Sequence, residues 1–593
     1  MNIKIIIAIL VSSIIILLFL LTPLSSFALQ RFDLLFVLFL SGFFFCVAML
    51  FAFLPNPKKD NNIIYIILIG YALYGILFIF KSSIIANGVR YFTLFDDAMI
   101  SMRYAKNLVN GYGLVWNPGG DRVEGYTNLL WTIYMAFWHL FPISSAKIAL
   151  PIQLTGLFFL LSNLWLTRRI ADHVSEGNLY VTVGAVLLVA CYQSINYWGL
   201  KGMETSVLGF IVLLSVWRVL CCLKDNLFDP LLFVILGIGL LVRPDVAIIY
   251  IGIALYMIIV LSDLRKKNTL YAASIFLLIQ LSLTIFRLVY YHDIFPNTYY
   301  LKMTGVPELV RITRGIKVAW EFIRGMSPLL FVLPFVYGFI HIKNKKIWFL
   351  LSLVVIQLLY SIYVGGDAWE WWGHLANRYI CIVMPLFFIL LSLVITSLLE
   401  GFANYMRMAA PLKKCLFIIL ITLTVIQMHG GFGKTVLNKL LHFPIFQIEE
   451  DKNNVLLALK IKDITSPDAK IAVGWAGAPP YFSDRFSIDL LGKNDALIAR
   501  QKAKGGWDGL FDPGHNKYDW RYSIGKLQPD LVLDYQELSF SKEENKDFKE
   551  HYRIFKIKKE KALLNSDSWI IYGRVKSTRI DWTKGTIIEW PKI

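Results

Sequence analysis

Long apolar runs alternate with short polar stretches over roughly the first 430 residues of the chain. Runs of about 20 apolar residues are long enough to cross a bilayer as helices. By this measure the sequence predicts a multi-pass α-helical membrane protein with about thirteen crossings. The predicted spans lie near residues 3–22, 33–54, 63–82, 148–167, 179–197, 205–223, 228–242, 246–261, 270–290, 327–341, 347–364, 378–397 and 413–428.

Two segments depart from this pattern. Residues 127–142 are apolar and aromatic but short for a span, so we expect a juxtamembrane or re-entrant helix there. Residues 303–326 place apolar positions at helical spacing with arginines and a lysine between them, which predicts a helix on the outer membrane surface. Contact of its cations with lipid headgroups is favoured over direct contact with substrate.

The tail is polar and charged, with strand-like runs at 471–473, 487–491, 531–533, 551–557 and 569–575. Helical stretches are expected near 449–463 and 494–503, so the tail predicts a soluble α/β or α+β domain. The predicted organisation is a helical hairpin at 1–54, a transmembrane module at 55–430 with its first outer loop at 83–147, and a soluble domain at 431–593.

Composition supports a membrane protein and argues against a nucleic-acid binder. The chain is 57% hydrophobic and only 17% charged, whereas a soluble protein would be about a quarter charged. Its net charge of +18 is scattered between apolar runs and does not form one basic soluble face. The six cysteines lie in or beside apolar runs without a CxxC spacing, so we expect neither a disulfide framework nor a thiol metal site.

Positive charge also predicts orientation, because Lys and Arg favour the cytoplasmic side. In the predicted topology Lys58, Lys59 and the clusters at 168–169, 265–267, 343–346 and 413–414 fall on that side. The stretches rich in Gly, Pro and aromatic residues, and the tail, fall on the other side. The Lys and Arg clusters and the stretches rich in Gly, Pro and aromatic residues are independent signals, and they fall on opposite faces. This agreement supports the topology.

The most unusual polar stretch runs from Thr93 to Trp131, where Asp96 and Asp97 stand beside each other close to apolar spans. Charges at a bilayer edge are costly and are typical of functional sites. Further candidates lie on the same predicted face. They are Arg103, Glu124, Lys201, Glu204, Arg243, Asp245, His292, Tyr299, Lys302, Asp367 and Arg378.

Several of these residues also have a simpler interpretation. An adjacent pair of aspartates is typical of a helix cap. Glu204 is placed to pair with Lys201, and Arg243 can pair with Asp245 across one proline. The sequence contains no tight spacing of His and carboxylate residues that would predict a metal site. Whether Asp96 or Asp97 holds a divalent cation stays open.

A carboxylate beside cations at a membrane surface suits sugar transfer from a lipid phosphate. The carboxylate takes the proton of an acceptor hydroxyl as that oxygen attacks the anomeric carbon. Lys or Arg stabilises the charge of the departing phosphate. A lipid carrier also explains why such a site lies at a bilayer.

The stretch FDDAMISMRYAKNLVNGYGLVWNPGGDRVEGYTNLLW resembles the first outer loop of bacterial GT-C glycosyltransferases of the terminal arabinofuranosyltransferase B type. The resemblance continues in order through GMET, RPD, YYHDIFPNTYYLK, GGD, NRY, AVGWAGAPPYFSDRFSIDLLGKND and GHNKYD. It covers nearly everything after about residue 85. The hairpin at 1–54 and the bulky stretch AWEWWGHLANRYI depart from the pattern.

The resemblance implies a GT-C fold in the bacterial inner membrane, with the active site and the C-terminal domain in the periplasm. It implies inverting transfer from a decaprenyl- or undecaprenyl-phosphate sugar, most simply D-arabinofuranose, to a glycan or a protein such as pilin. The first-loop aspartate of the family acts as base, a role that carries onto Asp96 or Asp97, and Asp96 is favoured. Lys302 and Arg378 are the candidates for the donor phosphate, with Arg243, His292, Tyr299 and Lys201 as further donor contacts.

Alternatives from other classes remain at this point. A flippase or transporter of lipid-linked glycans would place polar residues near mid-membrane on broken helices. A GT-C enzyme that uses another polyprenyl-phosphate sugar, such as mannose, and a non-catalytic envelope scaffold are also compatible with the sequence.

Overall fold

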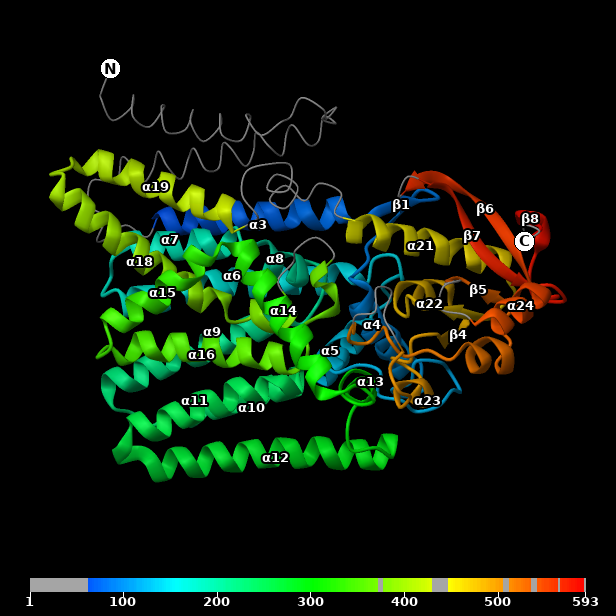
Figure 1. Cartoon of the computed structure of the whole chain (residues 1–593), viewed down its shortest axis with the longest axis horizontal. Coiled ribbons are helices and arrows are strands. Elements are labelled where there is room, and N and C mark those ends of the chain that lie inside the picture. Colours follow the sequence, from blue (N-terminus) through cyan, green and yellow to red (C-terminus); the bar gives the residue numbers. More distant parts are fainter. Residues whose placement is uncertain are drawn as a thin grey trace, which may run out of the picture.

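The computed structural model describes residues 62–371, 377–428, 446–504, 511–534, 541–563 and 566–590. A bundle of helices forms one end of the molecule, and a unit that contains a sheet forms the other (Figure 1). The predicted hairpin at 1–54, Lys58, Lys59 and the predicted boundary near residue 430 lie outside the described residues.

Within the described residues, seven helices are long and apolar enough to cross a membrane. They are α3 (Asn62–Ser82), α6 (Ala149–Val174), α9 (Thr205–Asp225), α12 (Arg265–Tyr291, preceded by η3, Ser262–Leu264), α16 (Lys345–Tyr363), α18 (Met384–Tyr405) and α19 (Ala410–Gln427). Two helix pairs qualify only as bent spans. These are α7 (Leu179–Ala190) with α8 (Gln193–Leu200), bent by 52°, and α14 (Glu308–Met326) with α15 (Pro328–Ile340), bent by 95°.

Eleven of the thirteen predicted spans fall within the described residues. The structure has seven to nine spans there. The runs at 228–242 and 246–261 form α10 (Pro230–Val242) and α11 (Ala247–Val260, preceded by η2, Pro244–Val246), of 13 and 14 residues. Helices of that length rise about 20 Å, short of the roughly 30 Å hydrocarbon core. The run at 179–197 breaks after Ala190, whose carbonyl accepts a hydrogen bond from Asn196 Nδ2 at 2.7 Å.

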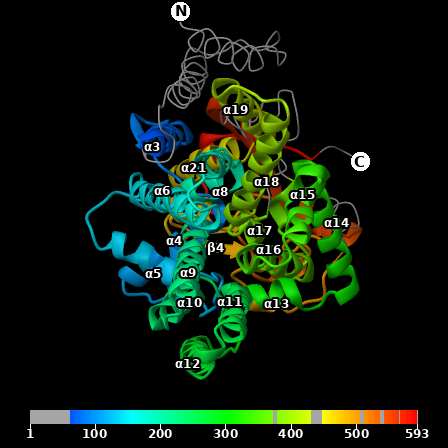
Figure 2. The same ribbon diagram turned by 90° about the vertical axis from the view of Figure 1, so that its left-hand side faces the viewer.

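The two ends of the bundle differ as the charge pattern predicts. The loops that join α11 to α12, α15 to α16 and α18 to α19 lie at the end away from the strands (Figure 1). The last turn of α6 lies there too, because Lys346 Nζ is 3.4 Å from the His173 carbonyl. These loops carry cationic clusters. Helix α12 stands at the edge of the bundle (Figure 2) and packs against α10 and α11.

Short elements join the bundle to the tail. They are β1 (Ile84–Ala86), β2 (Val89–Tyr91), α4 (Asp96–Val109), α5 (Leu129–His139), α13 (Asn297–Met303), η4 (Ala368–Trp371) and α17 (Arg378–Cys381). Helix α5 matches the short helix expected at 127–142. Helix α14 is the amphipathic helix expected at 303–326, but two of its cations do not face headgroups. Arg311 and Arg314 are buried and donate to the carbonyls of Tyr363 and Asp367.

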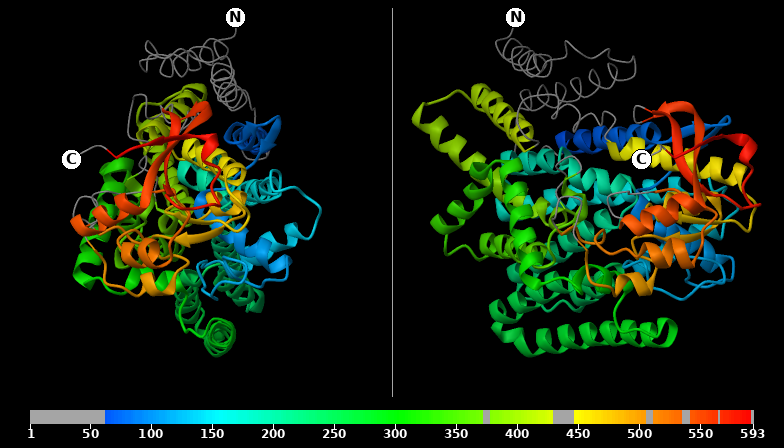
Figure 3. Two further views of the ribbon diagram at one scale, coloured as in Figure 1. Left: turned by 90° about the vertical axis from the view of Figure 1, so that its right-hand side faces the viewer. Right: turned by 45° about the vertical axis from the view of Figure 1, so that its right-hand side comes forward.

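The tail forms a six-stranded mixed sheet in the order β4-β3-β5-β7-β6-β8. The left view of Figure 3 faces this end of the molecule, where the tail is drawn in yellow to red. The three parallel strands are β3 (Lys470–Val473), β4 (Phe486–Asp489) and β5 (Leu531–Val532), and the antiparallel ones are β6 (Tyr552–Leu563), β7 (Ser566–Arg574) and β8 (Thr586–Ile588). Its helical pieces are α21 (Phe446–Ile464), α22 (Ala478–Ser483), α23 (Ala496–Ala499), η5 (Arg521–Lys526), α24 (Lys542–His551) and η7 (Trp582–Lys584). The five predicted strand runs are all present. The helix expected at 494–503 is only α23, because the described chain leaves helical geometry after Ala499.

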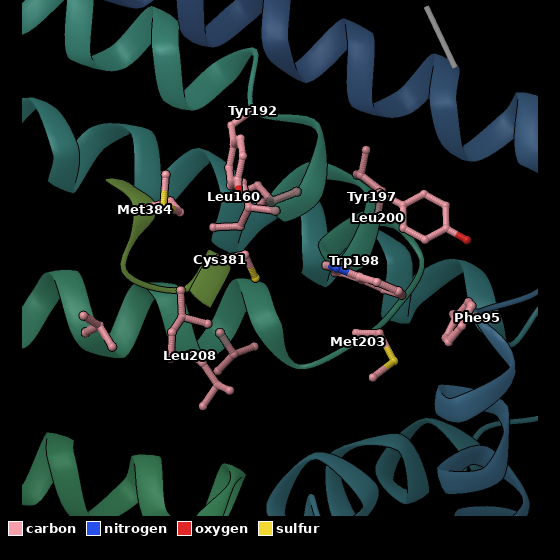
Figure 4. Packing of buried hydrophobic residues seen from close by; sticks show 14 of the residues in the cluster. Phe95, Leu160, Tyr192, Tyr197, Trp198, Leu200, Met203, Leu208, Cys381 and Met384 are labelled. Atoms are coloured by element: carbon pink, nitrogen blue, oxygen red, sulfur yellow. The ribbon is translucent and has the colours of Figure 1, made fainter. Parts of the chain in front are cut away.

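One buried core runs from the bundle into the tail. Phe95, which precedes α4, lies beside Trp198 of α8 and near Met203 (Figure 4). The same cluster includes Val473 of β3, so the apolar core continues across the junction. Burial of this kind is the main force that holds two units together. The junction is therefore a packed surface that can hold side chains from both units in fixed positions.

Candidate active site

The two neighbouring aspartates form the first turn of α4, where helix amide groups favour negative charge. The start of this helix is fixed from the bundle side. The Phe95 amide donates to the Lys201 carbonyl at 2.9 Å, and the Phe95 ring packs edge-on against Trp198 and Trp369. Gly202 has φ +79°, and a Cβ there would lie 2.6 Å from a Leu94 methyl group. The GMET turn therefore sets where α4 begins.

Asp96 points toward the tail and not into the site. Its carboxylate accepts hydrogen bonds from the backbone amides of Gly477 at 3.0 Å and Ala478 at 2.7 Å. Burial raises its pKa to about 8, and the nearby charge of Asp97 adds to the shift. A Cβ on Gly477 would lie 1.9 Å from the Asp96 carbonyl oxygen, so only glycine allows this approach. Asp96 docks α22 onto α4.

Asp97 faces a cavity of about 360 Å³ at the junction. Arg378 Nη1 donates to its Oδ2 at 2.6 Å, and Lys493 Nζ donates to its Oδ1. Burial alone would raise the pKa of Asp97, but Lys493, Arg378 and Lys302 together hold it well below its usual range. The carboxylate is therefore ionised and surrounded by cations.

The cations around Asp97 are held to different degrees. Arg378 is clamped by buried Asp367, which accepts from its Nε at 2.6 Å and its Nη2 at 2.7 Å. Lys302 of α13 lines the same cavity, and burial together with the Arg378 charge lowers its pKa. Among the described residues Lys302 has no ion pair with a carboxylate. It is the cation best able to accept an anionic ligand.

A second charged cluster lines another part of the wall. Arg243 binds both oxygens of Asp245, at 2.9 and 2.8 Å, and also binds Glu204 at 2.8 Å. The guanidinium lies 5.4 Å from the centroid of the Tyr379 ring. This cluster carries two carboxylates for one cation, the reverse of the balance around Asp97. The simpler interpretation of Arg243 and Asp245 as a pair is confirmed, and Glu204 pairs with Arg243 and not with Lys201.

The predicted residues divide into two groups by position. Those that line the cavity are Asp97, Glu204, Arg243, Asp245, Tyr299, Lys302 and Arg378. Those that do not line it are Asp96, Arg103, Glu124, Lys201, His292 and Asp367.

The second group supports the site from behind or lies apart from it. Lys201 is buried and binds Asp451 of α21 at 2.8 Å, while Arg103 donates to carbonyls of the tail. Glu124 binds Arg287 at 2.7 Å. His292 is exposed at the end of α12, with φ +56°. Neither Lys201 nor His292 lines the cavity, so its geometry gives no support to these two as direct donor contacts.

Sequence reasoning missed several wall residues. Lys493 comes from the tail, and Arg287, Thr284 and Gln280 come from one face of α12. Arg287, Thr284 and Gln280 recur at helical spacing within an apolar run, which is a signal the sequence did contain. Lys493 lies in the GKND end of a stretch that carries the family resemblance, but its charge alone does not stand out in a polar domain.

The residues present do not fit a divalent cation on Asp96 or Asp97. Both oxygens of Asp96 accept from backbone amides, and both oxygens of Asp97 accept from cationic side chains. In the described ranges no group of three His, Cys, Asp or Glu side chains gathers closely enough to hold a metal ion. Metal sites for hard cations require several free oxygen ligands.

Comparisons with known proteins show one related sequence and one matching domain family. The chain is 29% identical over 220 residues to a terminal β-(1→2)-arabinofuranosyltransferase of Mycobacterium tuberculosis. The match covers 34% of this chain and spans about a third of that relative's length (34%). A family model described as a domain of unknown function, DUF8728, matches residues 447–574 in the tail.

Two solved membrane-protein structures are similar to this chain to different degrees. An oligosaccharyltransferase from Archaeoglobus fulgidus in the apo form gives a TM-score of 0.51 at 10% identity, covering 90% of this chain and 76% of that chain. ArnT from Cupriavidus metallidurans, bound to undecaprenyl phosphate, gives a TM-score of 0.47 at 9% identity, covering 72% of this chain and 85% of that chain. The chain is thus a multi-pass membrane protein with the GT-C fold, and its sequence resembles a terminal arabinofuranosyltransferase, as its ordered motifs predict.

Proposed function

We propose that this protein is a glycosyltransferase that moves a sugar from a polyprenyl-phosphate donor to a hydroxyl group of an acceptor. The observation that carries the proposal is the arrangement of Asp97 beside Lys302 and Arg378 in one cavity, at the end of a membrane bundle. A base and an anion site are the two groups that this reaction needs.

Asp97 is the proposed base, and not Asp96 as the sequence favours, because both oxygens of Asp96 accept hydrogen bonds from backbone amides of the tail. The acceptor oxygen attacks the anomeric carbon, its proton passes to a carboxylate oxygen of Asp97, and the bond from that carbon to the phosphate oxygen breaks. The electron pair of that bond leaves on the polyprenyl phosphate. Attack opposite the leaving group inverts the configuration at the anomeric carbon.

The charge balance supports a phosphate at this place. Asp97 and Asp367 neutralise two of the three cations Arg378, Lys493 and Lys302, which leaves one positive charge in excess. A polyprenyl phosphosugar carries one negative charge on its phosphodiester. Fixed cations in a partly desolvated site stabilise such a group more strongly than water does. With these cations in place, the reaction as proposed requires no divalent cation.

The sugar, the acceptor and the sidedness extend the same proposal. The name of the mycobacterial relative supports arabinofuranose as the sugar. The proposal extends to the D form, carried on decaprenyl or undecaprenyl phosphate. The acceptor is a glycan or a protein such as pilin. The cationic loops lie at the bundle end away from α4 and α13 (Figure 1), two helices that line the cavity. This supports an inner-membrane protein with its site and tail in the periplasm.

The test is a transfer assay with purified protein in detergent and synthetic decaprenyl-phosphate donors of arabinofuranose and of mannose. We expect transfer of the sugar and release of decaprenyl phosphate, without release of inorganic phosphate. The arabinofuranose donor should be preferred over the mannose donor. Asp97→Asn keeps the shape and removes the base, and Asp121→Asn, an exposed residue of the same loop, is the matched control. Full activity in Asp97→Asn, or flipping of intact donor in liposomes without transfer, would contradict the proposal.

A further inference from the structure

Lys493 is a tail residue that enters the cavity of the bundle. It lies in the turn between β4 and α23, and 396 positions separate it from Asp97, to which its ammonium group is hydrogen-bonded. It also lines the cavity with Lys302 and Arg378. The wall of the candidate active site is therefore built by both units of the chain.

The turn that carries Lys493 is held rigidly within the tail. Asp489 accepts from the amides of Leu491 at 3.0 Å, Gly492 at 3.1 Å and Asn494 at 2.7 Å. Gly492 has φ +79°, a conformation that glycine adopts without strain. These contacts fix the backbone on both sides of Lys493.

The same turn is clamped from the membrane side by α13. Asn297 Nδ2 donates to the carbonyls of Gly492 and Lys493, both at 3.0 Å. Helix α13 also carries Lys302, the proposed phosphate contact. One short helix thus sets the positions of two lysines relative to each other, one from each unit.

The side chain of Lys493 is held by fewer contacts than that of its cationic neighbour Arg378. Arg378 has two of its nitrogens bound to buried Asp367, so only Nη1 reaches Asp97. Asp97 is the partner of the Lys493 ammonium in the described structure, and the side chain is 22% exposed. A lysine ammonium on a flexible stem can rotate between two nearby anions without moving its backbone.

We propose that Lys493 is shared between Asp97 and the donor phosphate, so that the tail couples phosphate binding to release of the base. Before the donor binds, Lys493 keeps Asp97 ionised and hydrogen-bonded. When the phosphate arrives, the ammonium turns toward it and Asp97 is free to take the acceptor proton. Lys493 stays protonated throughout, and after bond cleavage it stabilises the departing phosphate.

This inference rests on the proposed function and deepens it. It assigns Lys493 two measurable effects, one on the phosphate and one on Asp97. A charge-assisted hydrogen bond to phosphate contributes about tenfold or more in affinity. Loss of a cation beside Asp97 moves the pKa of that carboxyl upward, because burial is then opposed by fewer charges.

The experiment compares purified wild type, Lys493→Met, Lys493→Arg and the matched control Lys502→Met, an exposed lysine of the same domain. Undecaprenyl phosphate binding is measured by titration, and transfer is measured as kcat/KM against pH. For Lys493→Met we expect binding weakened about tenfold or more and the acid limb of kcat/KM shifted to higher pH. Lys493→Arg should keep the acid limb near its wild-type position.

Two results would overturn the inference. One is a folded Lys493→Met protein whose lipid-phosphate affinity and acid limb both match wild type. The other is equal weakening of binding by Lys502→Met. If wild type transfers no sugar but binds undecaprenyl phosphate through Lys493, the proposed function fails, and the binding arm alone still decides the role of Lys493 at the phosphate. Thermal unfolding of each variant separates these results from loss of folding.

Discussion

Two charged clusters line one cavity, and they differ in sign. Around Asp97 three cations meet two carboxylates, whereas around Arg243 one cation meets Glu204 and Asp245. An anion is attracted to the first cluster and repelled by the second, and carboxylates of the second suit the hydroxyl groups of a sugar. The difference indicates that the cavity binds the phosphate at the Asp97 side and sugar or acceptor hydroxyls at the Arg243 side.

The same substitution in each cluster should have very different effects. Asp97→Asn removes the proposed base, so we expect kcat to fall about 10²–10⁴-fold. Asp245→Asn leaves Arg243 paired with Glu204, so we expect a change in acceptor KM of less than about tenfold. Initial rates of sugar transfer with varied acceptor measure both. Equal losses in kcat would remove the distinction between the clusters.

Binding of the lipid phosphate should separate the clusters in the same way. Lys302→Met removes the cation without an ion pair in the described structure, and we expect affinity for undecaprenyl phosphate to fall about 10–100-fold. Glu204→Gln removes a negative charge from the other side and should leave affinity unchanged or slightly raised. A titration in detergent measures both values. If Glu204→Gln lowered the affinity for undecaprenyl phosphate more than Lys302→Met does, the phosphate would bind at the Arg243 cluster, against the account.

The contact between α4 and α22 provides a test of the junction that touches neither cluster. Gly477→Ala places a methyl group 1.9 Å from the Asp96 carbonyl oxygen, so the tail must move. We expect a loss of about 1–3 kcal/mol in stability and weaker transfer, since Lys493 then shifts from Asp97. Gly525→Ala, whose added Cβ meets nothing within 4 Å, is the control. The stability of both variants is measured by thermal unfolding. A Gly477→Ala protein as stable as the Gly525→Ala control would contradict a tightly packed junction.

The smallest expected effect is a pH dependence that comes from Asp96. Its pKa is raised to about 8 in the folded protein, whereas a carboxyl group in the unfolded chain titrates near 4. Between these values the folded state binds more protons than the unfolded state, so the free energy of unfolding falls as pH rises. Asp96→Asn should flatten this slope between about pH 5 and 8. Denaturation midpoints at several pH values measure it, and an unchanged slope would mean that the Asp96 pKa is not raised.

The sequence predicted a bundle of apolar helices, the five strand runs of the tail and the loop that carries the aspartates, but it overcounted the spans. These features depend on local periodicity and composition, which one sequence contains. It did not distinguish Asp96 from Asp97, because neighbouring residues in a first helical turn point about 100° apart. Contacts with distant segments decide which of them faces the cavity, Gly477 and Ala478 holding Asp96 while Arg378 and Lys493 hold Asp97. Lys493 and the break after Ala190 likewise depend on contacts between distant segments.

The most direct test of the central claim is a structure of the protein with undecaprenyl phosphate bound, determined by cryo-electron microscopy. The account predicts phosphate oxygens within hydrogen-bonding distance of Lys302 and Lys493, with a carboxylate oxygen of Asp97 left open to the cavity. A phosphate bound at Arg243, or outside this cavity, would contradict it.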